Sequence, residues 1–169
     1  MKIYPAGLIR EAQGFWGKAG SGMLYVCLED QTALLLLRSQ DVENPGTWGI
    51  PGGAVAGTEG HHSNQEEDVP EITHDQSRSS AEREAEEELG THVTSVKDLG
   101  MTTFRSGSFQ YLTYIVAISP QEKQRLESSV VLNWENDDCG WFPINQLPAP
   151  LHFGVEHTLK QADPSIFKN

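Results

Sequence analysis

The sequence predicts an α/β fold in which helices cover both faces of a mixed β-sheet. Apolar, strand-like runs recur along the chain and are separated by clusters of Gly, Pro, Asn and Ser. Four consecutive leucines at residues 34–37 do not alternate with polar residues, which is typical of a strand covered on both faces. Helical patterns lie between and after the strands. Together these patterns predict an α/β/α sandwich.

The first half of the chain is expected to consist mainly of strands. They are predicted at residues 23–29, 32–38 and 48–50, with a hairpin turn at 29–31 and a second turn at 51–53. The segment from residue 60 to 76 is polar and acidic and contains Pro70, so we expect an irregular excursion there.

The second half begins with a helix from Ser79 or Ser80 to Leu89. Either serine is suited to cap its free amide groups, and Gly90 supplies a left-handed stop. The remaining elements are strands at 93–105 and 109–118, extended segments at 130–134 and 140–143, and helices at 120–128 and 153–162.

Size and composition predict one domain spanning residues 1–169. The chain has 169 residues and 37% hydrophobic content, enough to bury one core. The longest apolar run, residues 33–37, is far shorter than the roughly 20 residues that cross a bilayer, and residues 1–14 lack the apolar stretch of a signal peptide. We therefore expect a cytoplasmic protein without membrane segments. Cys27 and Cys139 do not indicate a disulfide framework.

The formal net charge of −12 argues against binding to long nucleic acid, because such binding depends on patches of Lys and Arg. Small polyphosphates remain compatible with this charge. A divalent metal ion can supply the positive charge between a protein carboxylate and a phosphate.

The glutamates of the helix ending at Leu89 fall into two groups. Ala81, Ala85 and Leu89 form an apolar stripe at about 0°, 40° and 80° around the axis. One flank of the stripe carries Glu84, Glu87 and Glu88, at about 300°, 240° and 340°. Glu82 and Glu86 fall on the other flank and are expected to be bystanders.

Three carboxylates on one flank at the edge of the core repel one another, and partial desolvation increases the cost. A hard divalent cation such as Mg²⁺ relieves this conflict, because it prefers oxygen ligands and completes its shell with water and phosphate. For the helix alone, a solvated acidic face is the competing interpretation.

The wider context resembles the Nudix family. Gly53-x5-Glu59 followed by Arg83-Glu84-Ala85-Glu86-Glu87-Glu88-Leu89-Gly90 is similar to the Nudix box, G-x5-E-x7-R-E-U-x-E-E-x-G-U, where U is apolar. The preceding stretch at residues 46–53, GTWGIPGG, also resembles the family's usual lead-in. The resemblance implies a Nudix-like α/β/α sandwich and a Mg²⁺-dependent hydrolase.

Two features depart from this pattern. Twenty-three residues separate Glu59 from Arg83 where the family has seven, so the box carries 16 additional residues, and Thr91 stands at its final apolar position. Added loop length costs little entropy and leaves the carboxylate spacing intact. It leaves open whether Glu59 or Asp75 takes the supporting acidic role.

The resemblance implies roles for six residues. Mg²⁺, or Mn²⁺ as an alternative, would bind Glu84, Glu87, Glu88 and the carbonyl of Gly52, and Arg83 would orient an acidic neighbour. Glu135, in the loop before a late strand, would be a general base or an additional ligand. The implied catalytic residues are therefore Arg83, Glu87 and Glu135, with Asp138 as a weaker candidate.

Residues that contact the substrate are less well specified. Five aromatic residues are candidates for stacking on a base, and the alternative is that they fill the core: Trp48, Phe104, Phe109, Tyr111 and Trp134. His152 lies in a region where the family often contacts the base, so it is a candidate for base binding. The alternative is an ordinary histidine at the start of a helix. His61, His62 and His74 lie in the insertion among acidic residues, a cluster that could bind metal or cover the substrate; a solvated loop is the simpler interpretation.

The expected activity is hydrolysis of the pyrophosphate linkage in a nucleoside diphosphate derivative, with a (d)NTP converted to NMP as the leading case. The alternatives are an ADP-ribose or nucleotide-sugar hydrolase, a dinucleoside polyphosphate hydrolase, and a non-catalytic nucleotide-binding module. A small nucleotide is the expected partner, and a homodimer stays open.

Overall fold

The computed structural model describes residues 19–55, 73–106 and 109–169. Its centre is a mixed seven-stranded sheet with the order β3-β2-β1-β6-β5, in which β4 also pairs with β1 and β7 with β2. The strands are β1 (Ala19–Cys27), β2 (Thr32–Arg38), β3 (Trp48–Gly49), β4 (Gly52–Ala54), β5 (Lys97–Ser106), β6 (Phe109–Ala117) and β7 (Asn136–Pro143). Only the pairing of β1 with β6 is parallel among these named strands. The predicted α/β class is confirmed.

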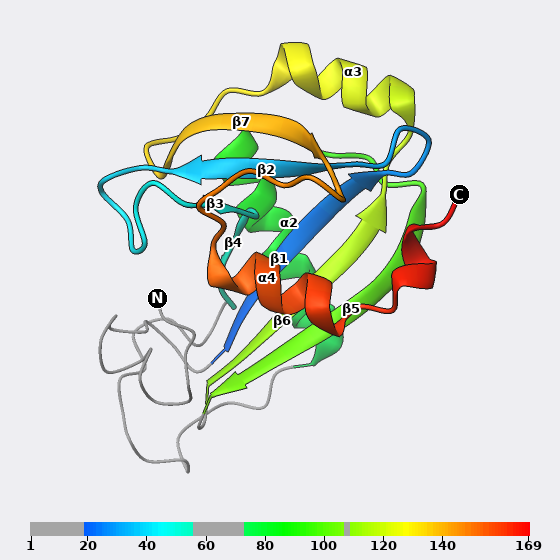
Figure 1. Cartoon of the computed structure of the whole chain (residues 1–169). Coiled ribbons are helices and arrows are strands. Elements are labelled where there is room, and N and C mark those ends of the chain that lie inside the picture. The colour runs from blue at the N-terminus through cyan, green and yellow to red at the C-terminus, as the bar shows by residue number, and fades with distance from the viewer. Residues whose placement is uncertain (1–18, 56–72, 107–108) are drawn as a thin grey trace.

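Helices pack on both faces of this sheet (Figure 1). They are α2 (His74–Leu89), α3 (Pro120–Ser129), α4 (Phe153–Gln161) and the 3-10 helix η2 (Pro164–Phe167). The alternating side chains of β1 divide between two cores. Met23 and Tyr25 belong to the core that includes the buried stripe of α2, whereas Leu24 and Val26 pack with residues that include Leu159 of α4.

The leucine run forms β2 and is covered on both faces, as its lack of alternation predicted. Leu34, Leu35 and Leu36 are all fully buried, and Leu37 is half-buried. Leu36 belongs to the core on the α2 side. Leu35 lines a small apolar cavity together with Val155 and Leu159 of α4.

Helix α2 begins earlier than predicted. Its N-cap is Thr73, whose hydroxyl accepts a hydrogen bond from the Gln76 amide (3.2 Å), while the Gln76 side chain accepts one from the Thr73 amide (2.9 Å). This reciprocal pair is a capping box. The predicted start at Ser79 or Ser80 is therefore wrong, and the excursion expected up to residue 76 ends before His74. Residues 60–72 of that excursion lie outside the described residues.

The predicted end of α2 is confirmed. Gly90 has a positive φ of 69°, and its amide donates to the carbonyl of Glu86 (2.9 Å). The segment predicted as extended at residues 130–134 closes this helix end and does not join the sheet. The amides of Val131 and Asn133 donate to the last carbonyls of α2, those of Leu89 and Glu88.

Several strand boundaries also differ from the prediction. Strand β1 covers Ala19–Cys27 and so begins before residue 23 and ends before residue 29. The turn expected at residues 51–53 is largely the short strand β4, because Gly52 and Gly53 pair with the glycine-containing start of β1. Strand β5 begins at Lys97 and not at residue 93. Strand β7 begins at Asn136, earlier than residue 140, because its polar first residues pair with the end of β2.

The structure also bears on the two cysteines and on membrane-spanning helices. The thiols of Cys27 and Cys139 are both free, as predicted. Among the residues described, no helix has both the length and the apolar character needed to cross a membrane.

Candidate active site

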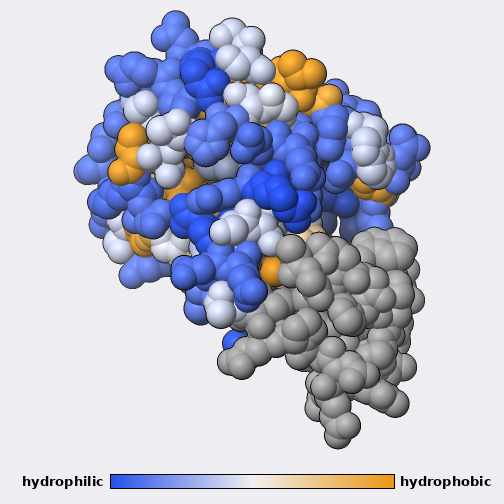
Figure 2. Space-filling model, turned by 180° about the vertical axis from the view of Figure 1, so that it is seen from behind, coloured by the Kyte–Doolittle hydropathy of each residue, from blue (hydrophilic) through white to orange (hydrophobic). Residues whose placement is uncertain are grey.

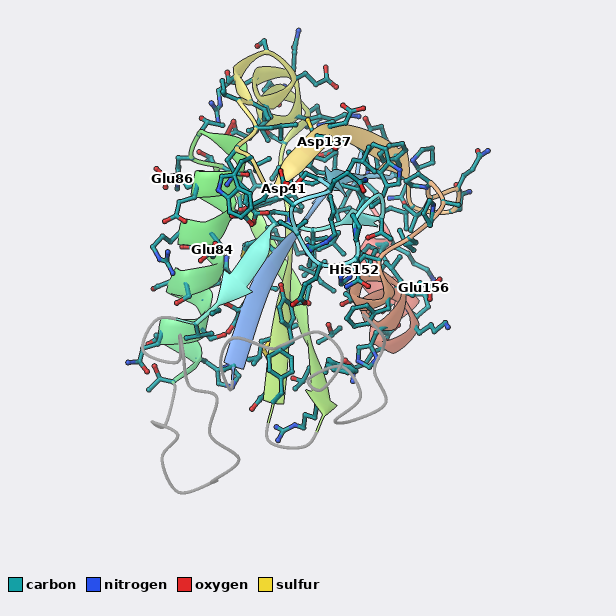
Figure 3. The ribbon with its side chains drawn as sticks, turned by 90° about the vertical axis from the view of Figure 1, so that its left-hand side faces the viewer. Asp41, Glu84, Glu86, Asp137, His152 and Glu156 are labelled. Carbon is teal, nitrogen blue, oxygen red and sulfur yellow. The ribbon has the colours of Figure 1, made fainter. Side chains whose placement is uncertain are left out.

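Helix α2 presents its glutamates at graded depths. Ala81, Ala85 and Leu89 are fully buried against the sheet, which confirms the predicted apolar stripe. Glu88 is only 4% exposed, and the Glu84 side chain is 17% exposed. Figure 3 shows Glu84 on the side of α2 toward the sheet and Glu86 on its outer side.

The outer surface of α2 is strongly polar. Glu82 pairs with Arg78 (2.7 Å), and the Glu86 side chain is 58% exposed, so both glutamates lie away from the half-buried Glu84 and the buried Glu88. The view from behind the molecule shows a mainly hydrophilic face with scattered apolar residues (Figure 2). This division agrees with the two flanks predicted from the helical spacing.

Glu88 joins three elements through one carboxylate. Its Oε2 accepts a hydrogen bond from the Gly52 amide in β4 (2.7 Å), and its Oε1 accepts one from the Asn136 side chain at the start of β7 (3.0 Å). Burial raises the pKa of Glu88 to about 8, because desolvation outweighs these two donors and the negative charges of Glu135 and Glu84 act in the same direction.

Gly52 and Gly53 make room for this arrangement. A Cβ on Gly53 would lie 2.6 Å from Cδ of Glu84, and a Cβ on Gly52 would lie 2.2 Å from the Tyr111 hydroxyl and 2.5 Å from the Ser21 carbonyl oxygen. Both positions therefore require glycine for close approach. The absence of side chains allows β4 to fit between β1 and the carboxylates of α2.

Arg83 lies beside two of the predicted ligands. Its guanidinium is 3.3 Å from the Glu84 carboxylate and donates to Glu87 one turn along the helix (3.0 Å). Glu87 is 55% exposed and is thus the outermost of the three predicted ligands. Asp75 lies eight residues before Arg83, about 12 Å along the helix axis. Glu59, the other candidate for the supporting acid, lies outside the described residues.

Glu135 approaches the same carboxylates from the loop before β7. Its backbone carbonyl accepts a hydrogen bond from the Ser39 amide (2.9 Å), and its side chain accepts one from Asn133 (3.3 Å). The next residue, Asn136, donates to Glu88, so this end of the loop lies beside that carboxylate, and the charge of Glu135 contributes to the raised pKa of Glu88. Asp138 is exposed and accepts a hydrogen bond from the Cys139 amide.

A cavity of about 190 Å³ adjoins the carboxylates. Gly52 and Gly53 line it, so the cavity and the acidic groups share the wall formed by β4. Four of the candidate substrate residues also line it, namely Phe104, Phe109, Tyr111 and His152. Figure 3 shows His152 at the start of α4, across the sheet from α2.

Two predicted aromatic residues lie elsewhere. The Trp48 ring is not part of the cavity lining within the described residues, and it packs edge-on against Phe142 at 4.9 Å. Trp134 is 66% exposed in the loop before β7. Phe109 lines the cavity. His74 lies in the first turn of α2, and His61 and His62 are outside the described residues.

Sequence reasoning missed Asn136 and Arg38. Asn136 is buried and donates to Glu88, and the adjacent Glu135 was the only signal for this segment. Arg38 ends β2, lines the cavity and lies close enough to Glu88 and Glu135 for their charges to raise the pKa of its guanidinium, which burial lowers. A basic residue directly after four leucines was its only signal.

The donor set fits a hard divalent cation in its chemistry. The side chains of Glu84, Glu88 and Glu135 offer oxygen ligands, and the charges of Glu135 and Glu84 add to the effect of burial in raising the pKa of Glu88. Within the described part of the chain, however, no group of three acidic, histidine or cysteine side chains is already arranged around one point. Glu87 pairs with Arg83, and Glu88 with Gly52 and Asn136.

The family model of the NUDIX domain matches residues 19–162, which include every described element of this site. The chain belongs to the Nudix family. It is therefore a Nudix hydrolase, a member of a family of pyrophosphohydrolases.

Solved structures share the Nudix fold at low sequence identity. A MutT Nudix hydrolase from Burkholderia pseudomallei is 22% identical, with a TM-score of 0.51 over 86% of this chain and 98% of that one. The Nudix hydrolase RenU from M. smegmatis is 21% identical, with a TM-score of 0.56 over 87% and 84% of the two chains. No curated protein matches the chain. At this level of identity the similarities establish the fold and do not identify the substrate.

Proposed function

We propose that this Nudix hydrolase cleaves the pyrophosphate linkage of a nucleoside diphosphate derivative, with a (d)NTP as substrate and NMP as product. One observation carries the proposal. The wall formed by Gly52 and Gly53 separates buried carboxylates from a cavity lined by aromatic rings. A nucleotide has the matching pair of chemical groups, a planar base beside a chain of phosphates.

In this proposal Glu84, Glu87 and Glu88 hold Mg²⁺ or Mn²⁺, assisted by the carbonyl of Gly52. The bound ion supplies charge neutralisation at the phosphates and activates a water molecule. Glu87 lies at the solvent side of the set and is paired with Arg83, so its carboxylate would turn from Arg83 to a bound cation. Arg83 contacts both Glu84 and Glu87 and so orients the ligands.

Glu135 is the proposed general base. It comes from a different element than the other carboxylates, and its side chain is held by Asn133. A base needs to receive a proton from the attacking water without serving as a structural support. Glu88 is less suited to that task because two hydrogen bonds already occupy its oxygens.

The test is a substrate panel followed by mass spectrometry of the products. Purified protein with Mg²⁺ is incubated with NTPs and dNTPs, dinucleoside polyphosphates, ADP-ribose and nucleotide sugars. We expect NMP from at least one triphosphate. Folded protein that cleaves no member of the panel would refute the proposal, and cleavage restricted to another class would transfer the assignment to that class.

Matched glutamate variants test the assignment of the carboxylates. Glu84→Gln and Glu87→Gln are each expected to lower kcat by about 100-fold or more, and Glu135→Gln by about 10²–10⁴-fold if it is the base. Glu86→Gln on the outer surface of the same helix is the control and should retain activity. Equal kcat values for Glu87→Gln and Glu86→Gln would remove Glu87 from the metal site.

A further inference from the structure

The cavity beside the carboxylates has flat apolar walls and a polar end. Phe104 packs edge-on against Phe153 and His157, with ring centroids 6.1 and 5.1 Å apart. All three rings line the cavity. Walls of this kind bind a planar ring of any base, and the polar groups at the edge of the cavity then select among bases through hydrogen bonds.

Arg38 and His152 stand side by side at the polar end of the cavity. An ideal Cβ on Gly49 would lie 3.5 Å from Cβ of His152 and 3.7 Å from Cδ of Arg38, so both side chains flank this glycine. Both also line the cavity. The end of β2 and the start of α4, on either side of Gly49 in β3, therefore bring together two side chains that are 114 positions apart in the sequence.

Arg38 has unused hydrogen-bond donors. Its Nε donates to the backbone carbonyl of Glu43 (2.7 Å), which fixes the plane of the guanidinium. Across residues 19–55, 73–106 and 109–169, neither of its terminal nitrogens has a hydrogen-bond acceptor or an ion-pair partner. A guanidinium offers donors only. It is therefore available for a planar acceptor in the cavity.

His152 is also limited to donating. The Gly154 amide donates to its Nδ1 (3.0 Å), which places the proton of the neutral ring on Nε2. Burial and the neighbouring Arg38 charge hold the pKa of His152 well below its ordinary value, so the ring stays neutral. In the described structure its Nε2 has no hydrogen-bond partner. The ring thus adds one more donor beside the guanidinium.

The complementary acceptor is the carboxylate of Glu43. This residue belongs to the loop between β2 and β3, and its carbonyl is bound to Arg38. Glu43 also lines the cavity, and the charge of Arg38 acts on its carboxylate. The edge of the cavity thus carries donors at Arg38 and His152 and an acceptor at Glu43.

Among the nucleobases, a 6-oxopurine matches this pattern. Guanine presents acceptors at O6 and N7 and donors at N1 and its 2-amino group, whereas adenine places an amino donor where guanine has O6. Adenine would set that donor against the donors of the cavity. A site built to form hydrogen bonds discriminates strongly against an analogue that leaves its buried groups unpaired.

We propose that Arg38 and His152 read the acceptor edge of a 6-oxopurine, with Glu43 as acceptor for its donors, so that the cavity selects guanine-type over adenine-type nucleotides. This inference rests on the proposed nucleotide-hydrolysing function of the same site. We expect a preference of about tenfold to a hundredfold, the range of one well-formed base contact.

The test compares GMP, IMP and AMP by calorimetry, and GTP, ITP and ATP by kcat/KM. Wild-type protein should bind GMP and IMP at least about tenfold more tightly than AMP. Glu43→Gln should reduce the preference for GMP over IMP, because inosine lacks the 2-amino group. Equal affinities for GMP and AMP, or no binding of GMP, would overturn the inference.

Two independent variants remove the donors. Arg38→Met keeps the length of the side chain, and His152→Ser keeps an oxygen to cap α4 while removing Nε2. Each should weaken GMP binding and bring the GMP-to-AMP ratio to within about threefold of unity, whereas Arg105→Met, an exposed arginine of β5, should leave the ratio unchanged. Ratios that stay at the wild-type value in both variants would contradict the assignment.

Binding and turnover separate the two proposals. Selective binding of GMP without hydrolysis of any nucleotide would support the base assignment and refute the hydrolytic function. Hydrolysis with equal kcat/KM for GTP and ATP would support the function and refute the base assignment.

Discussion

Glu88 combines a structural and a chemical role in one carboxylate. It is almost fully buried, yet the donors from Gly52 and Asn136 pair both of its oxygens. Unpaired, such a buried carboxylate would be strongly destabilising. These donors do not fully offset the cost of ionising a buried carboxylate, so the pKa of Glu88 is raised to about 8. A cation bound at this site would lower that pKa, because it favours the ionised form.

This raised pKa predicts a pH dependence of stability. The folded state retains a proton that the unfolded chain releases above its ordinary value of 4.5, so the stability of metal-free protein falls as pH rises from about 4.5 to 8. Glu88→Gln should remove this part of the decline. Thermal unfolding in EDTA at pH 5, 6, 7 and 8 should therefore show a smaller decrease in Tm for the variant.

Glu86→Gln is the matched control because Glu86 is exposed on the same helix. Its Tm profile should run parallel to that of wild type. Parallel profiles for wild type and Glu88→Gln between pH 5 and 8 would show that Glu88 has no raised pKa. Added Mg²⁺ should raise the Tm of wild type most at pH 8, where less proton release opposes binding.

At the scale of the element, α2 shows which helix features can be predicted from sequence. The buried stripe of Ala81, Ala85 and Leu89 and the stop at Gly90 follow from helical spacing and from the conformational freedom of glycine. The start was missed because several polar residues precede the stripe and more than one can cap. The reciprocal bonds of Thr73 and Gln76 decide among them.

Thr73→Ala tests this cap. We expect the free energy of unfolding to fall by about 1 kcal/mol, because the orphan amide of Gln76 loses its acceptor. Urea denaturation measures the change. Ser79→Ala is the control, since Ser79 is exposed within the helix, and it should change stability by less than about 0.5 kcal/mol. The opposite order of effects would restore a helix start at Ser79.

At the scale of the whole molecule, the covered sheet explains where the site lies. Helix α2 brings the carboxylates to one face of the sheet, and α4 and the loop before it bring His152 to the other. The glycines of β4 let the carboxylates and the cavity meet at one edge. The loops from 39 to 47 and from 130 to 135 add Glu43 and Glu135 to the same place.

Coverage of both faces predicts equal sensitivity of neighbouring leucines in β2. Leu35→Ala removes a side chain on the α4 side and Leu36→Ala one on the α2 side. Each should lower the free energy of unfolding by about 2–5 kcal/mol, because each leaves a cavity in a packed layer. Chemical denaturation measures both, and Val131→Ala at an exposed position serves as the control. A near-neutral result for either leucine would mean that its face is open.

The sequence by itself determined the family, the α/β class, the buried stripe of α2 and the grouping of its glutamates into two flanks. These features depend on local spacing, which the helix and strand repeats convert directly into faces. Only the tertiary structure decided that Glu88 is buried and Glu84 half-buried while Glu87 is exposed, and that Asn136, Glu135 and Arg38 join them. These contacts connect residues far apart in the chain, and their positions follow from sheet pairing and helix packing and not from spacing along the sequence.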